Sequence, residues 1–333
     1  MTTTMRAAWY ERKGPAADVL VVGEMPAPTP GPGEVRVRLA YSGINPGDTK
    51  KREGWLGSGM PYPRVVPHSD GAGVIDAVGA GAPDARIGER VWVWGAQSYR
   101  PFGTAAEFVV VPQEKAPPLP PDIAFPVGAC LGISARTAHR GVFADGPVAG
   151  RTVLVAGGAG NVGLAAVGLA AWGGATVIAT TGSPEQADHA RAAGAAFVID
   201  RHVPDLAAQI LAAAGGTGVD RIVEVAFGAN IALDEQVLAN GGVIASYASD
   251  ADPEPRMPFW TLLFKNAVIR LIGSDDLPAE AEQAAVRDIP VSMAGGRWRP
   301  EIARVLPLER IAEAHELVEH GGLSGHVLLG LEA

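Results

Sequence analysis

The N-terminal third of the chain alternates apolar and polar positions between turns that are rich in proline and glycine. In the segment 35–39, Val-Arg-Val-Arg-Leu, every second residue is apolar, and the turn Pro-Gly-Pro-Gly precedes it. The segment 90–94, Arg-Val-Trp-Val-Trp, has a similar pattern. A period of two between turn residues is typical of short strands that bury one face. The pattern therefore predicts a β-rich, barrel-like domain over about residues 5–120, which ends in a proline-dense connector.

From about residue 128 onward the pattern changes. Short segments rich in β-branched residues now alternate with alanine-rich segments that are long enough for helices. Strand and helix in turn predict a parallel, doubly wound α/β sheet. The elements predicted for this part are strands at 152–156, 175–180, 197–200, 221–225 and 242–246, an edge strand at 267–272, and then a helix at 308–319 and a strand at 326–329.

Composition is consistent with a globular protein of two domains. The chain has 333 residues, 47% of which are hydrophobic, so burial is not limiting. No apolar run reaches the roughly 18 residues that a membrane span needs. The start of the chain lacks a cationic segment followed by an apolar core, so we expect a cytoplasmic location. A single cysteine, Cys130, excludes an intramolecular disulfide and a four-cysteine zinc site.

The charge balance is acidic. The net charge is −9, basic residues are scattered, and the longest basic run is Lys50-Lys51-Arg52. Nucleic-acid binding receives no electrostatic support from this balance, so we expect neither a nucleic-acid nor a membrane partner.

One segment combines a strand, a glycine turn and a helix. Residues 152–163 read Thr-Val-Leu-Val-Ala-Gly-Gly-Ala-Gly-Asn-Val-Gly, and a small-residue helix follows to residue 172. In G-x-G-x-x-G, the first glycine permits the tight turn, the second lets backbone approach a diphosphate, and the third lets helix pack on strand. The helix N-terminus supplies amide donors and a positive dipole end. The dinucleotide-binding residues predicted here are Gly158, Ala159, Gly160, Asn161, Val162 and Gly163.

A β-rich domain, a nucleotide fold and a short C-terminal return resemble the medium-chain dehydrogenase/reductase superfamily over nearly the whole chain. The segments 43–48, 52–54, 68–74, 88–91, 137–140 and 241–243 look like its zinc-independent quinone oxidoreductase (zeta-crystallin-like) branch. The resemblance implies an α/β chain with a GroES-like, β-rich catalytic domain at 1–126 and 264–333. It places a Rossmann NADP-binding domain at 127–263.

Zinc alcohol dehydrogenases of this superfamily hold a catalytic ion with cysteine, histidine and cysteine. At those positions this chain has Asn45, Ser69 and Ile133. An amide, a hydroxyl and a hydrocarbon cannot replace two thiolates and an imidazole. The neighbouring His68 lies one residue early and points the other way if the segment is extended. We therefore expect no metal. Hydride addition to a quinone or enone needs less Lewis-acid help than alcohol oxidation, so we expect a reductase.

The end of the second strand of the nucleotide fold bears on the choice of cofactor. An acid about 20 residues after the glycines would bind an unphosphorylated ribose, but the first acid here is Glu185. The hydroxyls of Thr181 and Ser183 can donate to a 2′-phosphate. The resemblance places Arg201 where relatives have a residue over the adenosine phosphate. These residues predict NADPH, with binding of the ribose by Glu185 as the alternative.

The resemblance also implies a nicotinamide site. In the N-terminal domain, this site would consist of Asn45, Asp48 and Lys50. In the nucleotide fold, it would consist of the backbone of Tyr247, Ala248, Ser249, Gly273 and Ser274. Asn45 could hydrogen-bond the substrate carbonyl, or be a turn residue before proline. Asp48 is expected to hold its loop through backbone amides. Lys50 stands where relatives have an aromatic hydroxyl, and it could favour an anionic substrate or point to solvent.

Other side chains near these segments allow two interpretations each. His68 and His139 could donate a proton or be structural histidines. Trp55, Tyr62 and Phe259 could form the apolar walls of a quinone slot or belong to the core.

We therefore expect an NADPH-dependent, metal-free reductase that transfers hydride to a quinone or an α,β-unsaturated carbonyl compound. One alternative is an acyl-thioester enoyl reductase, in which Lys50, Lys51, Arg52 and Arg64 receive the phosphates of the acyl carrier. Another, which the resemblance also allows, is a crystallin-like or RNA-associated protein that binds NADPH without turnover. The apolar strand at 267–272 would leave an open sheet edge, which predicts a homodimer.

Overall fold

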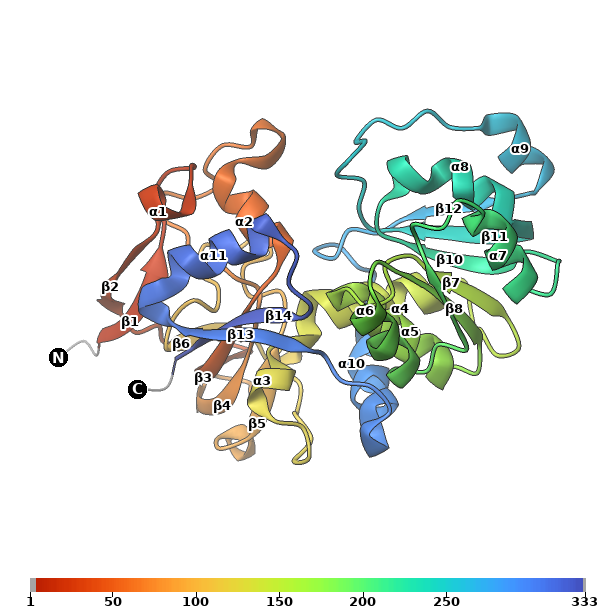
Figure 1. Cartoon of the computed structure of the whole chain (residues 1–333). Helices are drawn as coiled ribbons and strands as arrows, with labels where there is room; N and C mark the ends of the chain where they lie inside the picture. The colour runs from red at the N-terminus through yellow and green to blue at the C-terminus, as the bar shows by residue number, and fades with distance from the viewer. Residues whose placement is uncertain (1–3, 332–333) are drawn as a thin grey trace. The chain divides into compact units, whose positions relative to one another are not determined.

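A computed structural model describes residues 4–331, and Figure 1 shows the course of the chain. The chain forms two compact units. The first unit runs to Ile133 and resumes at Pro300, and the second unit is Ser134–Arg299. A π-helical turn at Leu131–Ala135 connects them.

The first unit is β-rich. The long strand β3 (Glu34–Ile44) organises its main sheet, because it pairs with β4 (Asp70–Val78) along one side and with two strands along the other. Its first half pairs with β6 (Phe108–Pro112) and its second half with β14 (His326–Gly330). The remaining elements are β1 (Thr4–Trp9), α1 (Ala16–Val19), β2 (Val21–Pro26), α2 (Pro46–Glu53), β5 (Arg90–Val93), α3 (Phe125–Gly128), β13 (Ile302–Pro307), α11 (Ile311–His320), and short 3₁₀ turns at Trp55–Gly57, Asp84–Arg86, Gln113–Lys115 and Leu308–Arg310.

The core of the first unit follows the alternation in the sequence. Val35, Val37 and Leu39 of β3 are buried, whereas Arg36 and Arg38 between them are not. The buried side chains of β3 pack with those of β5 and β6, including Val91 and Val109. The predicted strands at 35–39 and 90–94 are therefore confirmed, since a period of two places one face of each strand in the core.

The second unit is a doubly wound α/β domain. Its six strands are all parallel and lie in the order β12-β11-β10-β7-β8-β9. The elements are α4 (Arg136–Phe143), β7 (Thr152–Val155), α5 (Asn161–Trp172), β8 (Thr176–Thr181), α6 (Pro184–Ala192), β9 (Phe197–Asp200), α7 (Leu206–Ala213), β10 (Val219–Glu224), α8 (Phe227–Val237), β11 (Leu238–Ser246), α9 (Phe259–Phe264), β12 (Val268–Leu271), α10 (Ala279–Met293) and a 3₁₀ turn at Ala294–Gly296.

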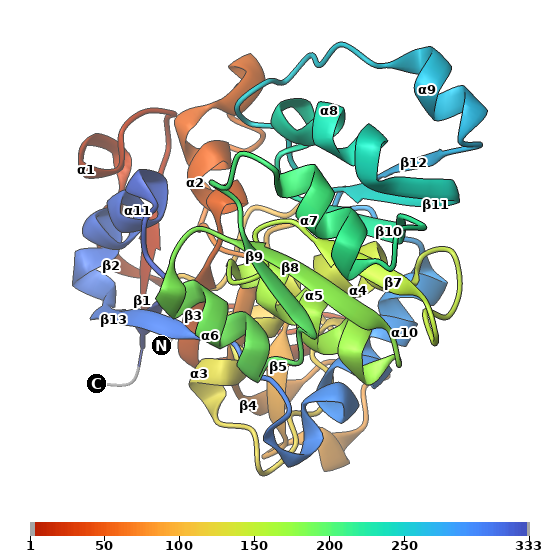
Figure 2. The ribbon, with the colours of Figure 1, turned by 45° about the vertical axis from the view of Figure 1, so that its right-hand side comes forward.

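Helices cover both faces of this sheet (Figures 1 and 2). On one face, Ile222 of β10 packs in a cluster with Ile210 of α7 and Ile231 of α8. On the other face, the neighbouring Val223 lies against Gly141 of α4, and α4 packs on α5 and α10. The strands therefore carry near-continuous apolar runs, as expected for a parallel sheet that is buried on both sides. The predicted α/β fold, with a β-rich domain and a doubly wound parallel sheet, is confirmed.

The boundaries of the compact units differ from the predicted domain boundaries at 126/127 and 263/264. The larger difference concerns residues 264–299, which belong to the second unit. The reason is that β12 extends the parallel sheet by pairing with β11, while α10 packs on α4 and α5. Of the described residues that follow this unit, 300–331 return to the first unit, where β14 pairs with β3.

No helix among residues 4–331 is both long enough and apolar enough to cross a membrane.

Candidate dinucleotide and substrate sites

The glycine turn between β7 and α5 is formed differently from the prediction at one position. The left-handed residue is Gly157, with a φ of +64°, and not Gly158, which was expected to permit the turn. Gly158 is needed for close packing instead, because a Cβ there would lie 2.7 Å from the Cβ of Ala179 in β8. A Cβ on Gly163 would lie 2.1 Å from the carbonyl oxygen of Gly157. Both contacts require glycine.

Gly160 has a different environment. It is the residue before α5, with φ −72° and ψ 167°, a conformation open to any residue. A Cβ there would have only the Gly157 carbonyl oxygen within 4 Å, at 3.4 Å. Gly160 is exposed, so the space above it is open to a ligand. This open approach to the backbone fits a diphosphate that lies directly on the turn.

The amide groups of the turn divide into two sets. The amides of Gly157 and Gly158 donate to Thr180, and that of Gly160 donates to the carbonyl of Gly157 at 2.9 Å. The first helical bond runs from Leu164 to Gly160, so the amides of residues 161–163 precede the helical ladder. The dipole and these amides make the start of α5 a favourable place for an anion. The amides that could donate to a diphosphate here are those of Asn161 and its successors, while Gly158 and Gly160 would supply shape.

The carboxyl end of β8 carries the groups predicted to select the cofactor. The amide of Arg201 donates to the carbonyl of Thr181 at 2.8 Å, which places Arg201 beside the end of β8. A Cβ on Gly182 would lie 3.0–3.2 Å from three atoms of the Arg201 guanidinium, so the guanidinium lies over Gly182. Ser183 is exposed and begins α6, where its Oγ accepts from Gln186. Thr181 is buried, so Ser183 offers the accessible hydroxyl.

The segment after β11 is bonded to the start of α8. The amide of Tyr247 donates to the carbonyl of Glu224 at 3.1 Å, and the carbonyl of Ala248 accepts from Phe227 at 3.0 Å. The Oγ of Ser249 accepts from Gly228 at 2.9 Å. These groups are used within the second unit, so the predicted nicotinamide contacts would involve the other backbone groups of residues 247–249.

Gly273 and Ser274 follow β12, at the carboxyl edge of the same parallel sheet. The carbonyl of Gly273 accepts from Asp276 at 3.4 Å. All the predicted dinucleotide-binding residues lie at or after the carboxyl ends of strands in one parallel sheet. That edge is where open α/β sheets bind ligands.

In the first unit, Asn45 begins α2 and forms a capping box with Asp48. The carboxylate of Asp48 accepts a hydrogen bond from the backbone amide of Asn45 at 2.8 Å. This bond accounts for the structural role predicted for Asp48. The Asn45 side chain donates to Oδ2 of Asp70 at 2.8 Å, and the same oxygen accepts from the backbone of Ile133 at 2.8 Å. Asn45 is thus both the turn residue of one interpretation and a side-chain amide that Asp70 holds in place.

The three positions that hold zinc in the zinc alcohol dehydrogenases lack the usual zinc ligands in this chain. Asn45 and the Ile133 backbone both donate hydrogen bonds to Asp70, and the buried Oγ of Ser69 has no hydrogen-bond partner among residues 4–331. Zinc is bound by thiolate, imidazole or carboxylate, and none of these three positions supplies such a group. The carboxylate beside them is that of Asp70, which accepts hydrogen bonds from two of them. No group of three or more His, Cys, Asp or Glu residues in the described chain could hold a metal ion.

The basic residues of the first unit separate into accessible and inaccessible groups. Lys50 of α2 is half-buried, and its Nζ lies 5.4 Å from the centre of the Trp55 ring. Arg52 is fully buried and bridges Glu319 of α11 and the carbonyl of Gly14. The expectation that Arg52 could receive carrier phosphates is therefore wrong. A buried guanidinium that already has partners is not available to a ligand.

The aromatic residues predicted as slot walls differ in burial. Trp55 and Phe259 are 54% and 59% exposed, so neither belongs to the core. Tyr62 is half-buried against the core cluster around Tyr10 and Val65, and its hydroxyl donates to the carbonyl of Tyr99 at 2.5 Å. Trp55 and Tyr62 belong to the first unit, whereas Phe259 begins α9 in the second.

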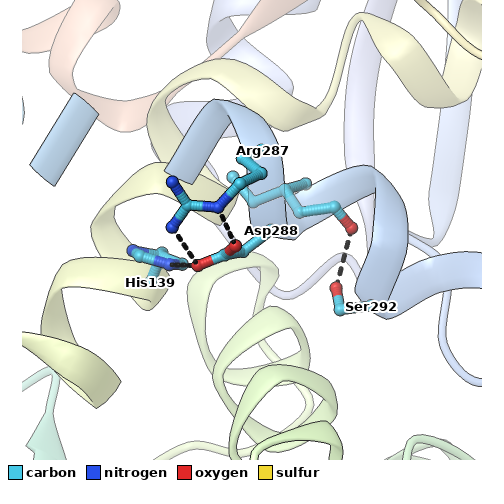
Figure 3. Close-up of polar contacts among 5 residues, drawn as sticks. His139, Arg287, Asp288 and Ser292 are labelled. Atoms are coloured by element: carbon cyan, nitrogen blue, oxygen red, sulfur yellow. Dashed lines mark hydrogen bonds and ion pairs between the residues drawn. The ribbon is translucent and has the colours of Figure 1, made fainter. Parts of the chain in front are cut away.

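Both candidate histidine acids have internal partners. His139 of α4 lies 3.0 Å from the carboxylate of Asp288 in α10, which also accepts from Arg287 (Figure 3). In the same view, Ser292 donates to the backbone one turn earlier in α10. Burial lowers the pKa of His139, although Asp288 opposes this shift. The contact connects α4 to α10 and gives His139 a structural role.

His68 lies in a buried chain of hydrogen bonds in the first unit. Thr104 donates to the carbonyl of Asp70, so Ser42 donates to Thr104 at 2.8 Å, and Nδ1 of His68 donates to Ser42 at 2.8 Å. Nε2 of His68 must then accept from Nε2 of His315 at 2.9 Å. Burial lowers the pKa of His68 to about 3 and that of His315 well below its ordinary value. Neither is suited to donate a proton at neutral pH.

The buried pair of His68 and His315 predicts that the folded protein loses stability in acid. Both histidines bind a proton less readily in the folded chain, so below about pH 6.5 the unfolded chain holds more protons and the free energy of unfolding falls as pH falls. The slope is at most about 1.4 kcal/mol per pH unit for each histidine. Replacing His315 with glutamine, whose amide still donates to His68, should make this loss shallower. Urea unfolding at neutral pH and at about pH 5 measures it, with the exposed His202→Gln as the control expected to match wild type. Equal acid slopes in wild type and His315→Gln would contradict it.

Comparisons with known proteins agree with this architecture. Residues 31–121 match the alcohol dehydrogenase GroES-like domain, and residues 161–287 match the zinc-binding dehydrogenase family. Human quinone oxidoreductase is 31% identical over 308 residues, which are 92% of each chain. A solved structure described as an NAD-dependent alcohol dehydrogenase has a TM-score of 0.87 at 30% identity, covering 98% of this chain and 100% of that one. A mycobacterial protein complexed with NADPH has a TM-score of 0.83 at 26% identity, covering 98% and 99%.

A GroES-like unit and a six-stranded parallel sheet with a glycine turn after its first strand define a medium-chain dehydrogenase/reductase. The chain belongs to the quinone oxidoreductase branch of that superfamily. It is an oxidoreductase that uses a nicotinamide cofactor. The open backbone at Gly160 and the donors at the start of α5 fit such a cofactor.

Proposed function

We propose that the protein is an NADPH-dependent reductase that transfers hydride, without a metal, to a quinone or an α,β-unsaturated carbonyl compound. The observation that carries the cofactor preference is the Arg201 guanidinium lying over Gly182 at the end of β8. Arg201 forms no ion pair with any other described residue, and the exposed Ser183 directly follows Gly182, over which the guanidinium lies. A guanidinium beside a hydroxyl suits a phosphate monoester, whereas a plain ribose would call for a carboxylate.

The relatives support this proposal to different degrees. The mycobacterial structure contains NADPH, and the human relative is a quinone oxidoreductase. The structure described as an NAD-dependent alcohol dehydrogenase favours the other dinucleotide. We give more weight to Arg201 in this chain, because the residues at the end of the second strand contact the ribose that distinguishes the two cofactors.

Each unit would contribute separately to the reaction. A reduced nicotinamide supplies the hydride when bound. The amides at the start of α5 neutralise the diphosphate, and Arg201 with Ser183 binds the 2′-phosphate. In the first unit, Asp70 fixes the orientation of the Asn45 amide, and we propose that Asn45 orients the acceptor carbonyl. A donor held in place in advance stabilises negative charge as it develops on that oxygen.

Metal independence and the acceptor class can be tested together. The purified protein, dialysed against a chelator, is assayed for oxidation of NADPH by a simple quinone, an enone and an enoyl-coenzyme A. Retained turnover with the quinone or enone supports the proposal, whereas loss that zinc restores would contradict metal independence. Turnover confined to the thioester, with inhibition by free coenzyme A, would favour an enoyl reductase. The burial of Arg52 argues against that alternative, because it removes one of four cations that could receive the carrier phosphates.

We also propose a homodimer formed through the edge of the parallel sheet. Within the described chain, β12 pairs with β11 on one side only, so its other edge has unpaired backbone groups. Leu271 of β12 is 74% exposed, and the neighbouring helix α9 exposes Trp260 and Phe264 at 68% and 74%. An open edge bordered by apolar side chains is normally covered, and a second copy offers the same edge in return.

Replacing Leu271 with arginine should convert the dimer into a monomer. The side chain is exposed in the single chain, so the substitution adds a charge to the proposed interface while leaving the core intact. Sedimentation should then give the monomer mass of 34.3 kDa, against twice that value for wild type. The matched control is Val305→Arg, because Val305 is 51% exposed on β13, the edge strand of the other sheet. A monomeric wild type, or dissociation by Val305→Arg alone, would contradict the proposal.

A further inference from the structure

Two buried carboxyl groups lie at the end of β10 and in the second half of α8, and no sequence motif marks either of them. Glu224 is the last residue of β10, and Asp234 lies in α8. Glu224 is fully buried and Asp234 is 1% exposed. Two carboxylates that contact each other away from water cannot both be ionised at neutral pH. One proton must therefore be held within the pair.

The hydrogen bonds show which group is ionised. Oε1 of Glu224 accepts from the backbone amide of Ala226 and from Nδ2 of Asn230, the latter at 3.0 Å. The amide of Val225 and the side chain of Asp234 also donate to this carboxyl group. Asp234 receives no hydrogen bond from other described residues. Donors stabilise the charged form, so Glu224 holds the charge and Asp234 holds the proton.

The shift in acidity agrees with this assignment. Burial, followed by the charge of Glu224, raises the pKa of Asp234 to about 9. The third titratable group here is Tyr247, which directly follows β11 and whose pKa is raised by burial and by Glu224. No cation among the described residues is a partner of this pair.

The pair holds backbone at the edge where the dinucleotide is expected. Glu224 binds the amides of Val225 and Ala226 through its carboxyl group, and its own carbonyl accepts from Tyr247 at 3.1 Å. The turn after β10 and the segment after β11 are thereby joined. The bond from Phe227 to the carbonyl of Ala248 reinforces the connection.

We propose that Glu224 and protonated Asp234 are positioning residues for the cofactor, which hold the Val225-Ala226 turn and the Tyr247 segment in the conformation that receives the nicotinamide end. The inference rests on the proposed function, because it takes the carboxyl edge of the sheet as the dinucleotide site. The residues act through backbone and need not touch the cofactor. Their role depends on the proton of Asp234, whose pKa is raised by burial and by Glu224.

The test compares Asp234→Asn with Asp234→Ala in the full-length protein. Asparagine donates to Glu224 as the protonated acid does, so its dissociation constant for NADPH should stay within about twofold of wild type at neutral pH. Alanine should weaken binding about tenfold, because Glu224 loses a donor. Above about pH 9 wild type should bind more weakly while Asp234→Asn does not change. Glu235→Gln, one residue further in α8, is the control for loss of a nearby charge and should match wild type.

The pH profile separates positioning from a purely structural role. Parallel profiles for wild type and Asp234→Asn, or an asparagine variant that binds as weakly as the alanine variant, would overturn the proposal. If Asp234→Ala does not fold, the comparison of wild type with Asp234→Asn decides the question alone. The same titrations with NADH keep the two proposals apart. Equal affinity for both dinucleotides would contradict the role of Arg201, whereas the effect of Asp234 is measured with whichever dinucleotide binds.

Discussion

Replacing Gly160 with alanine should weaken dinucleotide binding about 100-fold or more and leave the melting temperature unchanged. The backbone at Gly160 is open to any residue, and the new Cβ would meet protein only at 3.4 Å. The methyl group would instead occupy the space in which the diphosphate approaches the turn. Equilibrium titration with NADPH measures the loss, and thermal unfolding of the free protein checks the fold.

Two further glycine variants act as controls for this prediction. Gly163→Ala should lower the melting temperature, because its Cβ would lie 2.1 Å from the Gly157 carbonyl oxygen. Gly59→Ala in the first unit should change neither property, because nothing lies within 4 Å of its Cβ. Normal NADPH binding by Gly160→Ala would show that the diphosphate does not pass over this turn.

Replacing Arg201 with alanine should weaken NADPH binding about 10- to 100-fold and leave NADH binding nearly unchanged. A hydrogen bond to a charged group contributes roughly 1.5–3 kcal/mol, and only NADPH carries the phosphate that Arg201 would bind. Arg201 is exposed and is not part of the hydrophobic core cluster of the second unit, so its replacement should leave the fold intact. Titrations with each dinucleotide give the ratio of the two dissociation constants.

The conservative variant Arg201→Lys refines this result. Lysine keeps the charge but not the planar pair of donors, so it should restore part of the preference for NADPH. Arg191→Ala, an exposed arginine of α6 that pairs with Asp188, is the matched control and should behave as wild type. Equal weakening of both dinucleotides by Arg201→Ala would mean that Arg201 does not recognise the 2′-phosphate.

The strands of the second unit could be predicted from the sequence because local pattern determines them. Their observed carboxyl ends lie within one residue of the predicted ones, from Val155 in β7 to Leu271 in β12. In a parallel sheet buried on both faces, a β-branched run has few alternatives to a strand. The position of the carboxyl edge of the sheet, where we propose that the dinucleotide binds, follows from these ends.

Features that depend on distant partners could not be predicted in the same way. His68 and His315 are 247 residues apart, and nothing local marks either as half of a buried pair. The burial of Arg52 against Glu319 likewise arises from the return of the C-terminal helix. The left-handed turn at Gly157 was assigned to Gly158, because two adjacent glycines satisfy the same pattern and only the contact with β8 separates them.

The helix α10 was also missed, and with it the boundary of the second unit. Pro290 lies inside this helix, and proline normally ends a helical pattern. In the fold, α10 packs on α4 and α5, and His139 binds Asp288 within it. Tertiary contacts therefore maintain a helix that local preference would interrupt.

The measurement that tests the central claim most directly is a titration of the purified protein with NADPH and, separately, with NADH, followed by turnover on one quinone and one enone. The account predicts selective binding of NADPH and its oxidation by at least one of the two acceptors. Equal affinity for both dinucleotides would contradict the assignment of Arg201 and Ser183, and tight NADPH binding without oxidation by either acceptor would contradict the proposed reductase.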